Sequence, residues 1–354
     1  MHRKKIQKIL ESHPIRASAP CRIDMGGTLD ISTFHYPLRH LNPCTVNIAV
    51  DLRTEVSLHP FTAGKIKVTS KGFKSAEFKA DAAPFNHPLG LIFAVAAYFR
   101  IHGVHIMIDS ASPPRSALGG SSSAAVALIR GIATLLPELG DFFFSKPRTA
   151  LLAHAIESSV AGVPCGLQDQ LAAVYGGVNA WYWRSDPGSG VPYQKVSLVS
   201  KRHHRDLERH LLLAYCGIPH ESKSVNSVWI RQFLSAKYRT LWEQVVGLTH
   251  DFEKAVMKQE YQKAAQIIAV ETALRRKMTP FVLDEIGRRL VSSAERESCG
   301  ARFTGAGGGG CIWSIGEAEA VKRLKPQWEH ILSRRRGARL LEVKIDSAGV
   351  LSGG

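Results

Sequence analysis

The 354-residue sequence predicts a globular protein of mixed helices and strands, of the α+β or α/β class, in two domains. Its length is sufficient for two ordinary domains that each bury a core. A composition of 45% hydrophobic and 21% charged residues is typical of folded rather than disordered chains. Strand-like and helix-like patterns alternate in mixed order, without a repeat at solenoid or propeller spacing.

The elements of the N-terminal half follow from apolar periodicity. Alternating apolar residues predict half-buried strands over Asn47–Ser57 and Val104–Asp109. A helix is predicted from about Ser122 to Leu136, because serines can cap its start and the remainder is apolar at helical spacing. A second helix is predicted over Arg148–Val160, which leads toward Gly162.

The C-terminal half begins after two interruptions of the pattern. Asp186–Gly190 (DPGSG) predicts a hairpin turn, and His203–Arg209 is the more natural domain junction. Beyond it the sequence predicts a strand over Leu211–Tyr215, a long helical region over Asn226–Lys277, a short helix near Leu283 and two terminal strands.

Bulk properties argue against a membrane or secreted protein. The longest apolar run, Leu91–Phe99, is far shorter than the ~20 residues that cross a bilayer. A signal peptide has an apolar stretch after its basic start, and the basic start of this chain is followed by none. The six cysteines lie far apart, without CxxC pairs or histidines in zinc-ligand spacing. We therefore expect a cytoplasmic protein with reduced thiols and no membrane association.

The net charge of +16 would suit an anionic ligand or a nucleic acid. The basic residues are scattered, however. The clusters Arg3–Lys5, His203–Arg205 and Arg334–Arg336 carry no zinc-finger or aromatic-interleaved pattern, so solvated faces are the better interpretation. No specific nucleic-acid partner is expected.

The segment Pro113–Leu128 (PPRSALGGSSSAAVAL) runs from a strand through a Gly/Ser loop into a helix. Such a loop can bind phosphate, because glycines let backbone N–H groups approach the anion and the helix start adds positive potential. Serine hydroxyls can contact phosphate oxygens or magnesium. The alternative is an ordinary capped helix after a flexible turn.

Ala301–Ile315 (ARFTGAGGGGCIWSI) holds five glycines in six residues, which is costly to fold unless a ligand or the backbone needs close approach. It contains GxGxxG literally. A dinucleotide fingerprint follows a strand and opens a helix, whereas this segment leads into the strand-like CIWSI. A nicotinamide site is therefore rejected.

Two further segments place charged residues near glycine turns. In Ala19–Asp30 (APCRIDMGGTLD), Arg22 lies on a predicted strand and Asp30 just past the turn. In Gly162–Asn179 (GVPCGLQDQLAAVYGGVN), Asp169 lies between two glutamines, where a lone carboxylate is usually a helix cap.

Together these four segments resemble the GHMP kinases, the family of galactokinase, homoserine kinase, mevalonate kinase and phosphomevalonate kinase. The resemblance covers nearly the whole chain, and PPRSALGGSSSAA and RFTGAGGGGC are its most specific parts. It implies an α+β fold with a ribosomal-protein-S5-like N-terminal domain, residues 1–205, and a ferredoxin-like C-terminal domain, residues 206–354. Arg115 and Ala117 stand where the family's phosphate loop usually has glycines, and Arg302 replaces a common lysine.

Within the family, GLQDQLAAVYGGVN, APCRIDMGGTLD and Leu212–Ser224 (LLAYCGIPHESKS) look most like sugar kinases that act at the anomeric hydroxyl. The branches they resemble most are D-glycero-D-manno-heptose 7-phosphate kinase and fucokinase. The resemblance thus implies ATP-dependent, Mg²⁺-dependent phosphorylation of a sugar or sugar phosphate to a sugar 1-phosphate, by a monomer or homodimer. The alternatives are a kinase of a non-sugar alcohol such as mevalonate or homoserine, and a catalytically silent sensor of sugar or ATP.

The resemblance also assigns roles to individual residues. It implies that Asp169 is the catalytic aspartate and Arg22 its basic partner, and that Ser121 and Glu157 are the magnesium ligands. The residues implied to bind ATP are Pro114, Ser116, Leu118, Gly119, Gly120, Ser121, Ser122 and Ser123. Those implied to bind the acceptor substrate are Gly27, Asp30, Gln168, Thr304, Gly305, Ala306, Gly307 and Gly308.

Overall fold

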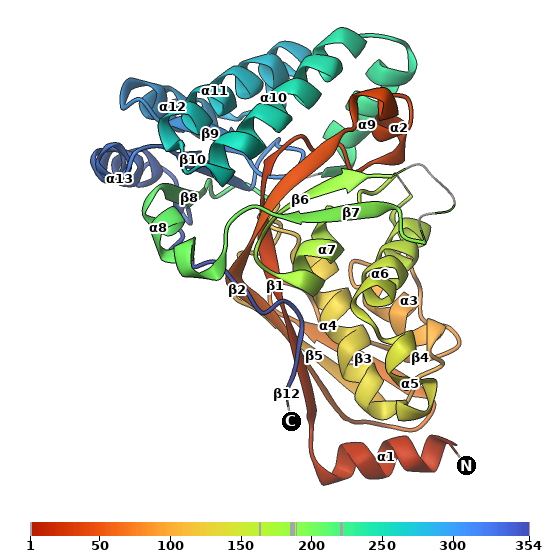
Figure 1. Ribbon diagram of the computed structural model, residues 1–354. Helices are drawn as coiled ribbons and strands as arrows, with labels where there is room; N and C mark the ends of the chain where they lie inside the picture. Colours follow the sequence, from red (N-terminus) through yellow and green to blue (C-terminus); the bar gives the residue numbers. More distant parts are fainter. Residues whose placement is uncertain (1, 163, 185–187, 189, 220–221, 354) are drawn as a thin grey trace.

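The computed structural model describes residues 2–162, 164–184, 188, 190–219 and 222–353, which form two β-sheets and the helices packed on them (Figure 1). The larger sheet has eight strands, with the order β12-β1-β2-β5-β3-β4 and with β6 joining β2 to β7. The smaller sheet has four strands, in the order β11-β8-β10-β9. This arrangement confirms the predicted α+β class.

The larger sheet is antiparallel except where β3 pairs with β5 in parallel. Its strands are β1 (Ile15–Gly26), β2 (Cys44–Pro60), β3 (Lys65–Ser70), β4 (Ala76–Lys79), β5 (Val104–Ser110), β6 (Val178–Trp183), β7 (Tyr193–Ser197) and β12 (Leu351–Gly353). The two strands predicted in this half are thus confirmed as parts of β2 and β5. The C-terminal strand β12 returns to pair with β1, far from its sequence neighbours.

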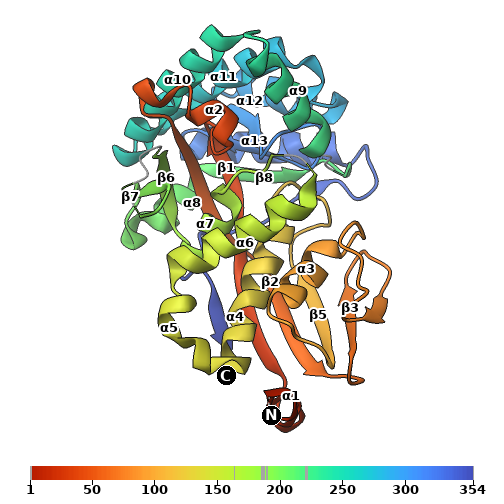
Figure 2. The ribbon, with the colours of Figure 1, turned by 90° about the vertical axis from the view of Figure 1, so that its right-hand side faces the viewer.

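Helices α3, α4, α6 and α7 cover one face of this sheet (Figure 2). The helices of this half are α1 (His2–Ser12), α2 (Ser32–His35), α3 (Gly90–Tyr98), α4 (Gly120–Leu135), α5 (Gly140–Phe143), α6 (Lys146–Ala161) and α7 (Gln168–Tyr175), with 3₁₀ turns at Arg39–Leu41 and Pro137–Leu139. The predicted helices α4 and α6 are confirmed. The expected serine cap of α4 is wrong, since its N-cap is Gly119 and makes no side-chain hydrogen bond.

The smaller sheet is antiparallel, and its strands follow the chain order βαββαβ of ferredoxin-like domains. The strands are β8 (Leu211–Tyr215), β9 (Gly300–Phe303), β10 (Cys311–Ile315) and β11 (Arg339–Leu340). The helices are α8 (His204–Arg209), α9 (Ser222–Leu234), α10 (Arg239–Met257), α11 (Tyr261–Met278), α12 (Glu285–Arg296) and α13 (Ala318–Leu332), with 3₁₀ turns at Lys201–His203 and Pro280–Val282.

The predictions for the C-terminal half hold in part. Strand β8 has the predicted bounds, and the long helical region is divided into α9, α10 and α11. The segment expected to be a junction, His203–Arg209, is largely helix α8. Strands β6 and β7 pair as an antiparallel hairpin, but residues 186, 187 and 189 of the predicted turn lie outside the described residues. The division at residues 205 and 206 stays a prediction.

Helix α13 was not predicted, and it lies between β10 and β11. It contains Pro326, which removes a backbone donor and usually interrupts a helix. Its buried residues Ala320, Val321, Leu324 and Trp328 recur at helical spacing and pack in the core. This packing outweighs the local cost of the proline.

In the described part of the chain, no single helix is long and apolar enough to cross a bilayer. Among the same residues, only α4 and the following segment Pro137–Phe143, which are bent by 94° at their junction, meet that criterion as a pair.

A network of four buried charged side chains joins the two sheets. Arg302 on β9 lies against Glu271 of α11, through its Nε atom, and its Nη1 lies 3.7 Å from Asp24 of β1. Arg275, one turn beyond Glu271, contacts the same carboxylate at 3.0 Å. The side chains of Arg302, Arg275 and Asp24 are fully buried, and that of Glu271 is 2% exposed. The two cations and two carboxylates balance, as buried charges require.

Candidate functional site

A cavity of about 600 Å³ lies where β1, the start of α4, α7 and the C-terminal glycine loop (residues 304–310, between β9 and β10) meet. This volume is in the range of pockets for small-molecule ligands. The predicted site residues that line it are Arg22, Asp30, Pro114, Ser116, Leu118, Gly119, Gly120, Ser121, Ser122, Glu157, Gln168, Asp169, Gly305 and Ala306. The fold therefore gathers most of the residues that the sequence singled out.

An ion pair between Arg22 and Asp169 lies in the wall of the cavity. The Nε and Nη2 atoms of Arg22 are each 2.7 Å from Asp169 Oδ1. Arg22 is nearly buried, whereas the Asp169 side chain is 24% exposed. Burial disfavours the charge of Arg22, but Asp169 and Asp24 outweigh this effect and raise the pKa of Arg22. The guanidinium therefore stays charged and holds Asp169 in one orientation.

Gly119 is the last residue of the loop before α4 (residues 111–119) and lies next to this ion pair. Its φ of 76° is in the left-handed region. A Cβ at this position would also lie 3.1 Å from Asp169 Oδ2. Any other residue would push against the carboxylate, so glycine lets the backbone at the start of α4 approach Asp169 closely.

Two serines at the start of α4 point toward Glu157 on α6. The Ser121 hydroxyl donates to Glu157 Oε1 at 3.3 Å, and the Ser122 hydroxyl donates to Oε2 at 2.7 Å. Gln170 of α7 donates to the same Oε2 atom at 2.7 Å. Burial raises the pKa of Glu157, and the charge of Asp169 adds to this effect. Hydroxyl and carboxylate oxygens are the donors that Mg²⁺ prefers, so the predicted pair Ser121 and Glu157 fits this ion.

Asp30 lies on the loop after β1 and is 7% exposed. Its two carboxylate oxygens accept hydrogen bonds from the backbone N–H and the side-chain amide of Gln168, each at 3.2 Å. Burial and the charges of Asp169 and Asp24 raise the pKa of Asp30 to about 7. The lining of the cavity thus includes a carboxylate that can accept hydrogen bonds from ligand hydroxyls.

The C-terminal glycine loop packs directly on the loop before α4. A Cβ on Gly310 would lie 2.6 Å from the carbonyl oxygen of Ser116, and the φ of Gly310 is 77°. Arg115 and Ala117 themselves have φ values of 54° and 63°. Both residues therefore adopt the left-handed conformation, which is strained for residues with a Cβ. These are the two positions at which the family that the sequence resembles usually has glycine.

Five predicted site residues do not line the cavity: Gly27, Ser123, Thr304, Gly307 and Gly308. The Ser123 hydroxyl donates to the carbonyl of Pro20 at 2.8 Å. The Gly27 carbonyl accepts from Arg275 at 2.5 Å. Thr304 lies behind the wall, where its hydroxyl accepts from the Asp24 N–H at 2.9 Å and approaches Arg22 Nη1 at 3.4 Å.

The sequence interpretation missed two groups of lining residues. One group is apolar and comes from the loop after β3, the start of α3 and β5: Phe73, Pro88, Leu89, Leu91, Ile92 and Ile108. The other is polar or basic: Lys71, Tyr215, Asn226 and Arg339. Apart from Tyr215, which lies in the resemblance segment Leu212–Ser224, no local motif marks these residues, because they come singly from separate elements and loops that only the fold brings together. Arg115 of the loop before α4 also lines the cavity.

Comparisons with known proteins agree with this geometry. Residues 86–177 match the GHMP kinases N terminal domain. A mevalonate kinase of Pyrococcus horikoshii is 24% identical over 85% of this chain and 88% of its own length. A D-glycero-alpha-D-manno-heptose 7-phosphate kinase of Campylobacter jejuni is 25% identical over 84% of this chain and 88% of its own length.

The fold is also that of solved family members. The structure of Lactococcus lactis galactokinase complexed with galactose superposes with a TM-score of 0.71 at 15% identity, over 99% of this chain and 98% of that chain. The matched region contains the loop before α4, Glu157 and Asp169, which the fold places around one cavity. Residues 86–177 are therefore identified as a GHMP kinase N-terminal domain, and the chain is similar over most of its length to ATP-dependent small-molecule kinases.

Proposed function

We propose that the protein transfers the γ-phosphoryl group of ATP to a sugar or sugar phosphate, at the anomeric hydroxyl, and releases a sugar 1-phosphate. The observation that carries this proposal is the meeting of two pairs at one cavity: Arg22 with Asp169, and Ser121 with Glu157. Phosphoryl transfer depends mainly on positioning and on neutralising charge. Both pairs suit these tasks.

The start of α4 is where the phosphates of ATP would bind. Gly119 and Gly120 line the cavity, and free backbone N–H groups at a helix start attract anions. The apolar lining residues, among them Phe73 and Leu89, offer a surface for the adenine ring beside this loop. Asp169, held by Arg22, would receive or orient the acceptor hydroxyl proton.

Ser121 and Glu157 would hold the Mg²⁺ ion that accompanies ATP. When bound there, the ion would neutralise charge on the phosphates. Ser121→Ala should therefore raise the Mg²⁺ concentration needed for half-maximal activity by about 10-fold, the loss of roughly 1.4 kcal/mol of binding. The measurement is ADP release at saturating ATP over a Mg²⁺ series. Ser123→Ala is the matched control, because the Ser123 side chain does not line the cavity and its hydroxyl donates to the backbone carbonyls of Pro20 and Gly119; an equal effect in both variants would refute the assignment.

Asp30 favours a polyhydroxylated acceptor over a carboxylate-bearing one. Its buried carboxylate can accept hydrogen bonds from sugar hydroxyls. The carboxylate of mevalonate or homoserine would meet the same charge and be repelled. The basic lining residues Lys71, Arg115 and Arg339 suit the phosphates of ATP and of a phosphorylated sugar. The similarity to mevalonate kinases, at nearly the same identity, keeps a non-sugar alcohol as the alternative acceptor.

Asp30→Asn should bind the acceptor more weakly yet make the protein more stable above pH 7. In the folded state the pKa of Asp30 is raised to about 7 from its usual 3.8, so the native protein binds more protons than the unfolded chain between these values. Stability therefore falls as pH rises through this window. The neutral variant avoids that loss, and we expect it to gain about 1–3 kcal/mol at pH 8 and nothing below pH 4.

The structure allows this substitution without a lost hydrogen bond. Gln168 Oε1 has no partner among the described atoms, so a flipped Gln168 amide could accept from the new asparagine amide. Thermal unfolding of both proteins at pH 4 and pH 8 measures the stability difference. In parallel, KM for the acceptor should rise by about 10-fold or more. A variant less stable at pH 8 would contradict the assigned environment.

The test of the function is ADP release by the purified protein with Mg-ATP against free hexoses, heptoses, their phosphates, mevalonate and homoserine. We expect turnover with one sugar or sugar phosphate, and phosphorus NMR of the product should identify a phosphate on the anomeric carbon. Turnover with mevalonate or homoserine alone would overturn the sugar proposal in favour of a non-sugar alcohol as the acceptor. ATP binding without turnover on any acceptor would favour a silent sensor.

A further inference from the structure

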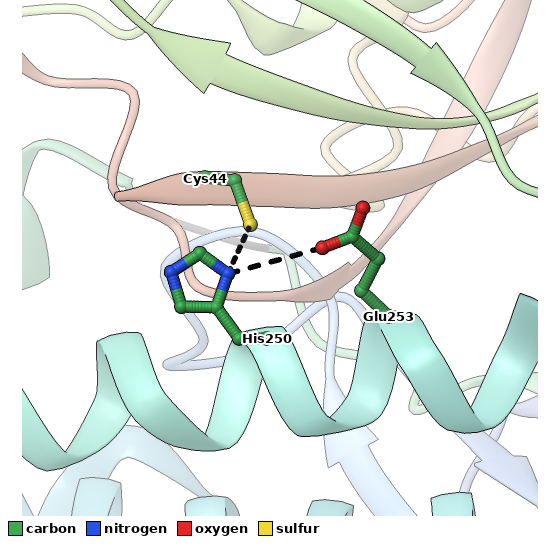
Figure 3. Close-up of side chains that lie close together, drawn as sticks. All are labelled: Cys44, His250 and Glu253. Carbon is green, nitrogen blue, oxygen red and sulfur yellow. Dashed lines mark hydrogen bonds and ion pairs between the residues drawn. The ribbon is translucent and has the colours of Figure 1, made fainter. Parts of the chain in front are cut away.

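Three potential metal ligands lie together between β2 and α10 (Figure 3). Cys44 is the first residue of β2, and His250 and Glu253 lie one turn apart on α10. Cys44 Sγ is 3.9 Å from His250 Nδ1, which is 3.8 Å from Glu253 Oε2. The three ligand atoms all lie within 4.8 Å of one another, close enough to share one ion.

The surroundings of the cluster are those of a partly buried ion site. Cys44 is fully buried, the Glu253 side chain is 7% exposed and His250 is 23% exposed. The hydroxyl of Tyr182, the cross-strand neighbour of Cys44, donates to Glu253 Oε2. In the part of the chain that the structure describes, His250 is the one basic side chain paired with Glu253. A buried carboxylate needs more compensation than a histidine at 3.8 Å supplies when that ring is neutral.

His250 is oriented as metal-binding histidines are. Its Nε2 lies 3.1 Å from the carbonyl oxygen of Leu41, so Nε2 carries a proton and donates it. Its ring stacks on Tyr182, with centroids 5.8 Å apart and planes at 22°. In the neutral ring the lone pair is then on Nδ1, which points toward both Cys44 and Glu253 (Figure 3). A backbone carbonyl is a common partner of the second ring nitrogen in a ligating histidine.

We propose that Cys44, His250 and Glu253 bind one divalent ion of the zinc class. A thiolate and a carboxylate together supply two negative charges, which match a divalent cation, and the neutral imidazole completes three ligands. The sulfur–nitrogen–oxygen set suits Zn²⁺, whereas Mg²⁺ prefers oxygen alone. Three protein ligands leave a fourth position for water.

This ion would be separate from the proposed Mg²⁺ site and would act on structure. None of the three ligands is among the described residues that line the 600 Å³ cavity. The ligands come from β2 of the larger sheet and α10 beside the smaller one, so the ion would tie the two parts together. Thr45, next to Cys44, accepts the Leu29 N–H at 3.0 Å and thereby fixes the loop that carries Asp30. Metal binding should therefore stabilise the protein and that loop.

The test is titration of metal-free full-length protein with Co²⁺ and Zn²⁺. We expect one equivalent of Co²⁺ to bind with a thiolate-to-cobalt charge-transfer absorption, Zn²⁺ to displace it, and Tm to rise in both cases. Cys44→Ser should abolish the charge-transfer band, and Glu253→Gln should weaken Zn²⁺ binding by more than about 10-fold.

Matched controls are Cys299→Ser and His204→Gln, which remove a buried cysteine and a histidine elsewhere and should leave the titration unchanged. The wild-type spectrum tests the proposal even if Cys44→Ser fails to fold. Binding of Co²⁺ without thiolate absorption, or equal Zn²⁺ affinity in wild type and Glu253→Gln, would overturn the site and leave a simple His250–Glu253 ion pair. Neither result would bear on kinase turnover, which the ADP-release assay decides separately.

Discussion

Asp169→Asn should lower kcat by about 10²- to 10⁴-fold while leaving ATP binding almost unchanged. The asparagine side chain keeps the shape of aspartate but can neither accept a proton nor compensate the Arg22 charge. Arg22 Nε and Nη2 would lose their carboxylate partner, and the guanidinium, still donating through Nη1 to the Ala117 carbonyl, would be held less firmly in the position that fixes the reacting groups. Because Asp169 is 24% exposed and Asp24 and Asp30 remain near Arg22, we expect the fold to persist.

The measurement is ADP release at saturating ATP and acceptor, with ATP affinity determined separately by calorimetry. Asp141→Asn is a matched control, since this carboxylate is exposed on α5 and is not among the residues that line the cavity. Activity of Asp169→Asn within a few-fold of wild type would remove Asp169 from the catalytic role. Loss of ATP binding in the same variant would instead indicate damage to the loop before α4, which Asp169 contacts at Gly119.

Glu271→Gln should destabilise the protein by about 3–5 kcal/mol at neutral pH. Glu271 balances both Arg302 and Arg275, and the two guanidinium groups are fully buried. Glutamine can accept with one oxygen only, and its NH₂ group would face a donor. Asp24 alone would then compensate two buried cations. Chemical denaturation with an unchanged m-value measures the loss.

The same variant has a defined pH dependence. Burial opposes the charge of Glu271, but Arg302 and Arg275 outweigh it and lower the pKa of Glu271. The stabilisation is therefore present above the usual pKa of 4.5 and is lost as pH falls through the lower folded-state value. The difference between wild type and variant should shrink below about pH 4. The exposed pair Lys65–Glu77 gives the control, since Glu77→Gln should cost no more than about 1 kcal/mol; equal losses would contradict the proposed role of burial.

Elements with local signals were predictable from the amino-acid sequence alone. The apolar spacing of α4 and α6 and the run that forms β8 place these elements within two residues of their observed bounds, because a helix or strand with one buried face shows that face in its periodicity. The glycine- and serine-rich loop also predicted an anion site at the start of α4, and this site stays a prediction. Asp169, Arg22 and Glu157 came from the family resemblance and not from any local pattern.

Contacts between residues far apart in the chain depend on the packing of the whole fold. Arg22 and Asp169 are 147 positions apart, and Cys44 and His250 are 206 positions apart. A search for zinc ligands at short spacing in the sequence therefore could not find the cluster of Cys44, His250 and Glu253, because its members come from β2 and α10. The apolar part of the cavity and the network around Glu271 likewise combine single residues from separate elements. Local periodicity reports which face of an element is buried, whereas the partner that buries it is fixed by packing of the whole chain.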